Sequence, residues 1–196
     1  MKIKPAVSDI INEIEDELRE FEFRGQKGID TLNITKKIAK IGNDYNYSVW
    51  TKGGDVDCKI INAHIFTSAH EWLYDLIWYK YKEGKHYALT EIILAMESEW
   101  GGKRKGADDE NDPYGEVKYD FQKLLVCNSP LKLMVFKTHG NNKDTNKLLE
   151  YFQERINESV NTRPNEIFII AYYYYDRKIR KYMCKTNQFS KDGTNI

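Results

Sequence analysis

The sequence is poor in cysteine and proline and carries no excess of either charge. Its 196 residues include three cysteines and four prolines, and 30 Lys and Arg balance 30 Asp and Glu, so the formal net charge is zero. A chain without net charge has no global field to attract a polyanion, which argues against a protein that simply coats nucleic acid. An enzyme with a local basic groove beside an acidic centre is not excluded. Hydrophobic residues make up 41% of the chain, as in an ordinary globular protein.

Long apolar runs and a cysteine motif are also missing. The longest apolar stretches are far shorter than the roughly 20 residues that span a bilayer, and the start of the chain shows no signal segment. Cys58, Cys127 and Cys184 are widely separated, which indicates free thiols in a reducing compartment. Cys58 with His64 and His70 lacks the fourth ligand and the further thiolates of a zinc site. We therefore expect a cytoplasmic protein without a membrane or zinc.

The apolar patterns that are present predict one α/β domain around a single sheet. Helical spacing predicts helices over 7–23, 30–44, 116–127 and 144–160. Strand patterns cover YNYSVWTK, 71–81, 87–100, 131–138 and a hairpin within 166–185, with a weaker strand pattern in DCKIINAHIF. We expect a single domain over 1–185 and a polar tail over 186–196.

Two acids lie at the end of an apolar strand, in EIILAMESEW (91–100). Because side chains alternate along a strand, Glu97 and Glu99 share a face and lie about 6.5–7 Å apart. Burying one carboxylate without a partner is costly, and burying two side by side costs more. A positive group is therefore expected beside them.

A third acid, Asp75, lies in the middle of the apolar segment 71–81. An antiparallel hairpin with 87–100 would place Asp75 opposite Glu97, on the same face of the sheet. Three carboxylates on one partly buried face suit Mg²⁺, with Mn²⁺ as a substitute, because such ions bind carboxylate, water and phosphate oxygens. A bound ion would polarise a phosphate and acidify a water molecule. Lys123, on the next helix, would stabilise the negative charge that develops.

The pattern of Asp75, then Glu97-x-Glu99 at a strand end, then a helix and a strand, resembles the PD-(D/E)xK nuclease superfamily. In that superfamily an Asp on one strand and a Glu-x-Lys on the next hold the metal. Here Tyr74 stands in place of the Pro, and Glu99 in place of the Lys. Some restriction enzymes of the superfamily carry Glu at that position. In other members the lysine lies on the following helix, which here would be Lys123.

This resemblance covers residues 30–138 and implies the αβββαβ core of the restriction-endonuclease-like fold, a mixed central sheet with helices on both faces. The superfamily often adds an acid on its first core helix, where 30–44 offers Asp44 near the end. The resemblance implies a magnesium-dependent endonuclease with metal ligands Asp75, Glu97 and Glu99 and with Lys123 as a further catalytic residue.

Each of these features also has a plainer interpretation. The acids could face water on an edge strand, where charges prevent edge-to-edge pairing. Lys123 could pair with Asp120 three residues earlier, a contact worth about 0.2–0.5 kcal/mol. The four tyrosines at 172–175 are typical of sheet packing.

Two basic runs bear on nucleic-acid binding. Lys103, Arg104 and Lys105 follow the acids in the glycine-rich loop 101–115 and would contact a phosphate backbone, or would form a solvated loop. The run RKIRK (177–181) is interpreted as the exterior of a hairpin.

These observations leave two functions open. The first is a metal-dependent phosphodiesterase acting on nucleic acid, either DNA or RNA. The second is a non-catalytic binding or assembly protein on a nuclease-like α/β scaffold, with Glu97 and Glu99 paired to basic residues. Neutral net charge and the missing Glu-x-Lys favour the second. The sequence is also compatible with a homodimer.

Overall fold

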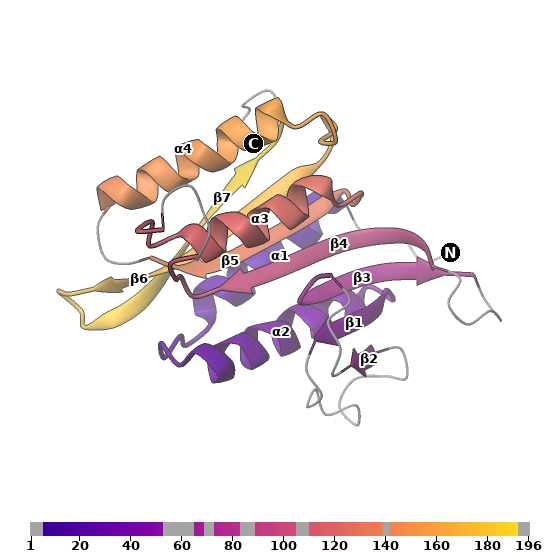
Figure 1. The fold of residues 1–196 in the computed structure, drawn as a ribbon. Helices are drawn as coiled ribbons and strands as arrows, with labels where there is room; N and C mark the ends of the chain where they lie inside the picture. Colours follow the sequence, from indigo (N-terminus) through magenta and orange to yellow (C-terminus); the bar gives the residue numbers. More distant parts are fainter. Residues whose placement is uncertain are drawn as a thin grey trace. The chain divides into compact units, whose positions relative to one another are not determined.

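The computed structural model describes residues 6–52, 65–68, 73–82, 89–104, 110–138 and 142–191. The chain forms two compact units, residues 1–93 and 94–196, and the boundary falls within strand β4 (Leu89–Glu99). Each unit combines helices with strands, so the α/β class is as predicted (Figure 1). A single domain over 1–185, the restriction-endonuclease-like core and helices on both faces of one sheet stay predictions.

In its described residues, the first unit has two helices and three short strands besides the start of β4. The helices are α1 (Val7–Glu20) and α2 (Lys27–Asp44), and the strands are β1 (Ser48–Lys52), β2 (Ile65–Ser68) and β3 (Leu76–Tyr81). Strand β1 pairs in parallel with β2 and antiparallel with β3. The buried Trp78 on β3 donates its indole N–H to the carbonyl oxygen of Ile38 on α2, at 3.1 Å. This bond ties the helix to the strands.

Helix α2 begins three residues earlier than the sequence predicted, at Lys27. The buried carboxylate of Asp30 accepts hydrogen bonds from the backbone N–H groups of Arg24 and Gln26, at 3.1 and 2.6 Å. Asp30 thus fixes the connection from α1 and extends the first turn of α2. Tyr45, just after α2, also joins the helices, because its hydroxyl donates to Glu13 at 2.7 Å.

The described part of the second unit has the rest of β4, two helices and three further strands. In chain order they are α3 (Gly115–Val126), β5 (Leu131–Lys137), α4 (Asn142–Glu158), β6 (Ile167–Asp176) and β7 (Lys181–Phe189). Strands β4, β5 and β6 are parallel, and β7 is antiparallel to β6. Right-handed crossovers from β4 to β5 and from β5 to β6 bring both helices to one side of these strands (Figure 1).

Aromatic side chains fill the core between these helices and strands. Phe121 on α3 lies 4.2 Å from Phe152 on α4 and 5.8 Å from Phe168 on β6, measured between ring centroids. Phe136 on β5 lies 5.9 Å from Phe152. All four rings are fully buried. The packed face of β4–β6 is therefore the face that carries Phe136, Phe168 and, by strand alternation and register, Glu97.

Most predicted elements of the second unit are confirmed to within two residues at each end. One boundary is wrong: β7 continues to Phe189, so residues 186–189 belong to a strand and not to the polar tail. Phe189 is buried and pairs with Phe168, which holds the end of β7 in the ladder. Cys127 and Cys184 are free thiols, as predicted, whereas Cys58, His64 and His70 lie outside the described residues. No helix among the described residues is long and apolar enough to cross a membrane.

Candidate functional site

The structure brings Glu97 on β4 together with Lys123 on α3. The Glu97 side chain is almost completely buried, with 2% of its surface exposed, and its Oε1 lies 3.3 Å from the Lys123 ammonium. The same ammonium lies 2.8 Å from Oδ1 of Asp120. Lys123 therefore lies beside one of the predicted acids and also makes the i,i+3 pair of the plainer interpretation; its catalytic role stays a prediction. One ammonium between two carboxylates explains how a buried strand can end on an acid.

The loop after β4 positions this lysine. Gly101 adopts φ 88°, a left-handed conformation that favours glycine, and the chain then turns back over the start of α3. The N–H of Gly102 donates to Pro113, and the N–H of Glu116 donates to Gly102. At Gly115 a Cβ would lie 2.9 Å from the backbone nitrogen of Arg104, so this loop fits closely against the helix. Because α3 starts at Gly115, Lys123 lies about two turns into the helix, where its ammonium contacts Glu97.

The carboxylates keep Lys123 charged. Burial by itself would lower the pKa of this ammonium, but the hydrogen bond to Asp120 and the negative charge of Glu97 outweigh burial and raise its pKa above the ordinary value. The buried Glu97 carboxylate in turn has the Lys123 ammonium as its partner. Glu97 is thus buried, whereas Lys123 and Asp120 remain 18% and 13% exposed.

A second glutamate lies near Glu97 at the end of β4. Glu99 lies two residues after Glu97 on the same face of β4, and its Oε1 accepts a hydrogen bond from the N–H of Trp100 at 2.8 Å. Glu97, Glu99 and Asp120 together carry three formal negative charges against the one positive charge of Lys123. We call these four residues the carboxylate cluster.

The donor chemistry of the carboxylate cluster fits a hard cation. Mg²⁺ binds carboxylate oxygens, often one or two, and completes its shell with water and phosphate oxygens. Glu97 and Glu99 would supply such oxygens. Among the described residues, no group of three or more acidic, histidine or cysteine side chains is arranged to hold a metal ion. An ion bound by Glu97 and Glu99 would have to take most of its ligands from water and substrate.

Asp75 belongs to the first unit and lies immediately before β3, not in the middle of a strand as the sequence indicated. The reason is a bend at Leu73, which adopts φ 86° and delays the strand. Asp75 is half-buried, and its Oδ1 lies 4.0 Å from the ammonium of Lys52 on β1. The expected meeting of Asp75 with Glu97 and Glu99 stays a prediction.

Arg104, one of the three expected phosphate contacts, lies beside the carboxylate cluster. Its guanidinium stacks 3.2 Å from the centroid of Tyr119, and its Nη1 lies 2.9 Å from Glu116. Lys123 approaches the same ring, at 5.6 Å from the centroid. Tyr119, which is 41% exposed, thus brings two cations together at the surface of α3. Lys103 is exposed, with its ammonium 3.2 Å from Asn111, and Lys105 lies outside the described residues.

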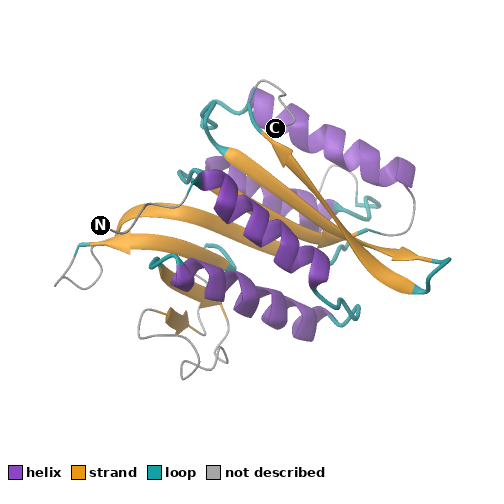
Figure 2. Cartoon of the chain, turned by 180° about the vertical axis from the view of Figure 1, so that it is seen from behind, coloured by secondary structure: helices purple, strands orange, loops and turns teal. Residues whose placement is uncertain are grey.

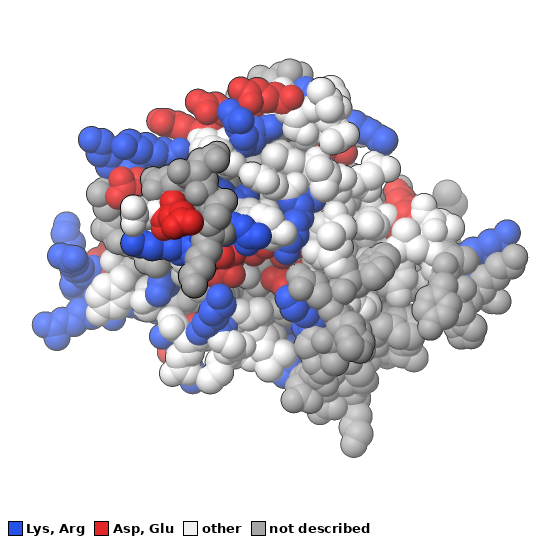
Figure 3. Space-filling view, viewed as in Figure 1, with Lys and Arg blue, Asp and Glu red and all other residues white. Residues whose placement is uncertain are grey.

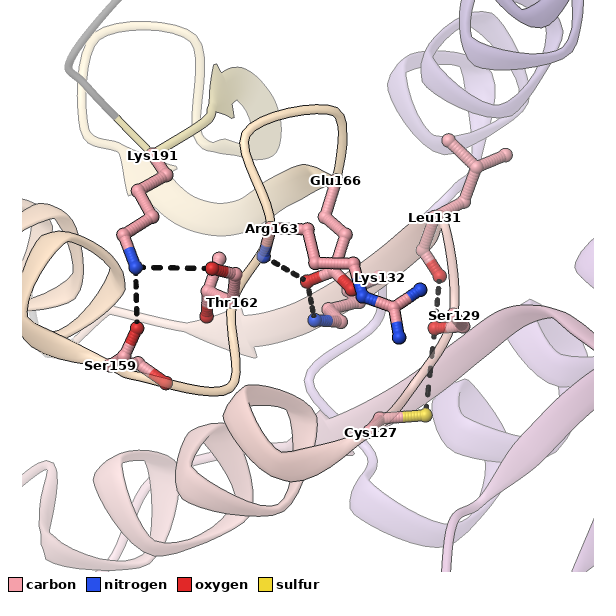
Figure 4. Close-up of polar contacts among 9 residues, drawn as sticks. All are labelled: Cys127, Ser129, Leu131, Lys132, Ser159, Thr162, Arg163, Glu166 and Lys191. Atoms are coloured by element: carbon pink, nitrogen blue, oxygen red, sulfur yellow. Dashed lines mark hydrogen bonds and ion pairs between the residues drawn. The ribbon is translucent and has the colours of Figure 1, made fainter.

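A second buried ion pair was not found by sequence reasoning. Lys132 on β5 lies 2.5 Å from Glu166, which immediately precedes β6, and both side chains are sealed from solvent (Figure 4). The same Glu166 oxygen accepts the N–H of Arg163 at 3.2 Å. Next to the pair, Cys127 donates its thiol to Ser129, whose hydroxyl donates to the carbonyl of Leu131.

Lys191 completes this network at the far end of the loop, with its ammonium on the carbonyl oxygens of Ser159 and Thr162 (Figure 4). Each charged group in Figure 4 that lies in the interior has a partner within the unit. We call the contacts of Lys132, Glu166 and the Arg163 N–H the Lys132 network. We interpret it as holding in place the loops that precede β5 and β6. Lys132 lies in the mostly apolar segment LKLMVF, and no residue near it in the sequence indicates that its side chain is buried.

No protein-family model, curated protein or solved structure matches this chain. The similarity to the PD-(D/E)xK superfamily therefore stays a hypothesis based on residues.

Proposed function

We propose that the chain is a metal-dependent phosphodiesterase that hydrolyses nucleic acid at the carboxylate cluster. The observation that carries the proposal is the buried Glu97 carboxylate at the end of β4, 3.3 Å from the ammonium of Lys123. A buried ion pair is costly to build, and such pairs are enriched at functional sites, although structural networks such as Lys132–Glu166 also contain them. A bound Mg²⁺ would polarise the phosphate and lower the pKa of a water molecule.

The residues of the chain have separate roles in this proposal. Glu97 and Glu99 hold the cation, and Asp75 is the further ligand that the sequence predicts. Lys123 places a positive charge where the attacked phosphate becomes more negative, which stabilises the transition state. Asp120 keeps the Lys123 side chain in position through its 2.8 Å contact. Arg104, stacked on Tyr119, offers a contact for a neighbouring phosphate.

The decisive experiment compares two glutamates of the same strand. Glu97→Gln should reduce Mg²⁺-dependent cleavage of DNA or RNA about a hundredfold or more, the usual effect of removing one electrostatic contact to the transition state. Glu91→Gln is the matched control, because Glu91 also lies on β4 but is exposed and pairs with Lys80. Asp75→Asn and Lys123→Gln should also reduce cleavage. Cleavage that survives Glu97→Gln and Asp75→Asn would rule out this site.

The same contacts also suit a non-catalytic binding or assembly protein. In that case Lys123 is the final partner of Glu97 and Asp120, and no metal is required. Thermal unfolding with and without Mg²⁺ or Mn²⁺ separates the two functions. A metal that binds the folded chain should stabilise it by about 1–3 kcal/mol at saturation, and Glu97→Gln should abolish that shift. An unfolding temperature that neither metal changes would favour the binding protein.

A further inference from the structure

The hairpin of β6 and β7 extends beyond the other strands of the second unit. The ladder between β5 and β6 ends where Lys137 pairs with Tyr173, and the N–H of Thr138 closes it on the Tyr173 carbonyl at 2.8 Å. Three further pairs join β6 to β7: Tyr174 with Met183, Tyr175 with Tyr182, and Asp176 with Lys181. At about 3.4 Å per residue, these pairs form a two-stranded ribbon about 10 Å long. We call residues 174–183 the hairpin arm.

Positive charge is concentrated at the tip of the hairpin arm. Arg177, Lys178, Arg180 and Lys181 are all exposed, and Figure 3 shows Lys and Arg side chains gathered at the left, over this tip. Among the described residues, no acidic side chain forms an ion pair with any of the four. This distinguishes them from Arg104, Lys118, Lys123 and Arg155 in the same unit, each of which has a carboxylate within 3.5 Å.

The hairpin arm is held in a defined shape without using these cations. Asp176 accepts the backbone N–H groups of Lys178 and Ile179, at 2.8 and 3.4 Å, so the single acid of the tip is engaged in the turn. Tyr175 and Tyr182 form an edge-to-face pair 5.2 Å apart. Figure 2 shows the turn from behind, in teal, at the end of two orange strands. An isolated two-stranded hairpin is marginally stable, and these contacts preorganise it.

The cations need an explanation beyond protection of a sheet edge. Lysines along an edge strand prevent pairing with other chains, which accounts for Lys181 and Lys185 on β7, the last strand of the order. Arg177, Lys178 and Arg180 lie at or beyond the end of the ladder, where they protect no edge. Close like charges repel one another and lower the stability of the hairpin. An anionic partner would remove this repulsion.

We infer that the hairpin arm enters the major groove of duplex DNA. That groove is about 12 Å wide and 8.5 Å deep and admits a two-stranded β-ribbon, which matches the dimensions of the arm. The four cations contact phosphates on either side of the groove. Ile179, 57% exposed at the tip, makes apolar contact with base edges. This inference rests on the proposed function and names its substrate as double-stranded DNA.

Binding should be measured by fluorescence anisotropy with a short labelled duplex, without divalent metal and in a Glu97→Gln background, so that no cleavage intervenes. The test variant carries Arg177→Gln, Lys178→Gln, Arg180→Gln and Lys181→Gln. The control variant removes four exposed cations elsewhere, through Lys27→Gln, Lys82→Gln, Lys147→Gln and Arg163→Gln. Both variants change the net charge equally, so a difference between them reports position and not total charge.

We expect the test variant to bind DNA at least about tenfold more weakly than the control variant. The slope of log K against log salt should fall by about 3.6, since each lost phosphate contact removes about 0.9. Ile179→Ala should weaken binding without changing that slope. Duplex RNA, with a major groove too narrow and deep for side chains to read, should bind more weakly than DNA.

Equal DNA binding by the test and control variants would overturn the inference, and so would equal binding of duplex RNA or anionic lipid vesicles. The result is independent of catalysis. If the arm is needed for binding but Glu97→Gln leaves cleavage of the native chain intact, the arm stands and the carboxylate cluster is wrong as the catalytic site. If cleavage depends on Glu97 while the arm is dispensable for binding, the reverse holds.

Discussion

The ammonium of Lys132 lies 2.5 Å from the carboxylate of Glu166, and neither side chain reaches solvent. Burial removes water from Lys132 and lowers its pKa below the ordinary value, although Glu166 acts in the opposite direction. Such a pair contributes little net stability but is costly to break, because the remaining charge is buried without a partner. It holds β5 and β6 together where both strands begin.

Lys132→Met should therefore destabilise the chain by about 3–5 kcal/mol in urea unfolding followed by circular dichroism. The double variant Lys132→Met, Glu166→Leu should cost much less than the sum of the two single changes. Lys80→Met is the control, because the Lys80–Glu91 pair is exposed and should contribute at most about 1 kcal/mol. Additive costs would show that the buried charges do not depend on each other.

Two glycines of α2 should respond in opposite ways to alanine. A Cβ on Gly42 would lie 2.6 Å from Cδ1 of the buried Trp78, which cannot move without breaking its bond to Ile38. Gly42→Ala should cost about 1–3 kcal/mol through overpacking. Gly28 has no neighbouring atom within 4 Å of that position, so Gly28→Ala should add up to about 1 kcal/mol through helix propensity. Urea unfolding measures both, and a tolerated Gly42→Ala would contradict the close approach.

The Asp30 carboxylate should stabilise the fold through its hydrogen bonds to two backbone N–H groups. Asp30→Ala leaves the N–H groups of Arg24 and Gln26 without their acceptor and should cost about 1–3 kcal/mol. The control is Asp44→Ala at the other end of α2, where the exposed pair with Lys40 should be worth about 0.5 kcal/mol or less. Equal losses of stability would mean that the Asp30 contacts do not define the start of the helix.

Alkaline pH should weaken the contact between Tyr45 and Glu13. The hydrogen bond to Glu13 raises the pKa of Tyr45 from 10.0 to about 12. Between these values the unfolded chain loses the proton while the folded chain retains it, so this contribution is present below pH 10 and disappears as the pH approaches 12. The urea midpoint of Tyr45→Phe should fall less between pH 9.5 and about 11.5 than that of the native chain. Identical falls would show that Tyr45 is not the group responsible.

Local patterns were sufficient to predict many elements of the second unit. Apolar residues at helical spacing, among them Phe121 and Leu124, place α3 correctly, and alternation places Glu97 and Glu99 on one face of β4. The patterns succeed because periodicity depends on residues close in sequence, which face the same core. The hairpin 166–185 was recognised for the same reason, although its strand β7 runs four residues further.

Other features depend on residues that are distant in sequence. Nothing near Lys132 indicates that a lysine can be buried there, because its partner Glu166 lies 34 residues away. The bend at Leu73, which moves Asp75 out of the strand, is equally invisible in an apolar segment.

The sequence by itself determined the α/β class, the order of most elements and the presence of acids at the end of β4, since these follow from local periodicity. The tertiary structure decided that Lys123 meets both Glu97 and Asp120, that Arg104 and Lys123 share one aromatic ring, and that four cations extend from a hairpin beyond the neighbouring strands. Those relationships depend on where separate elements pack, and packing is set by the whole core and not by any one segment.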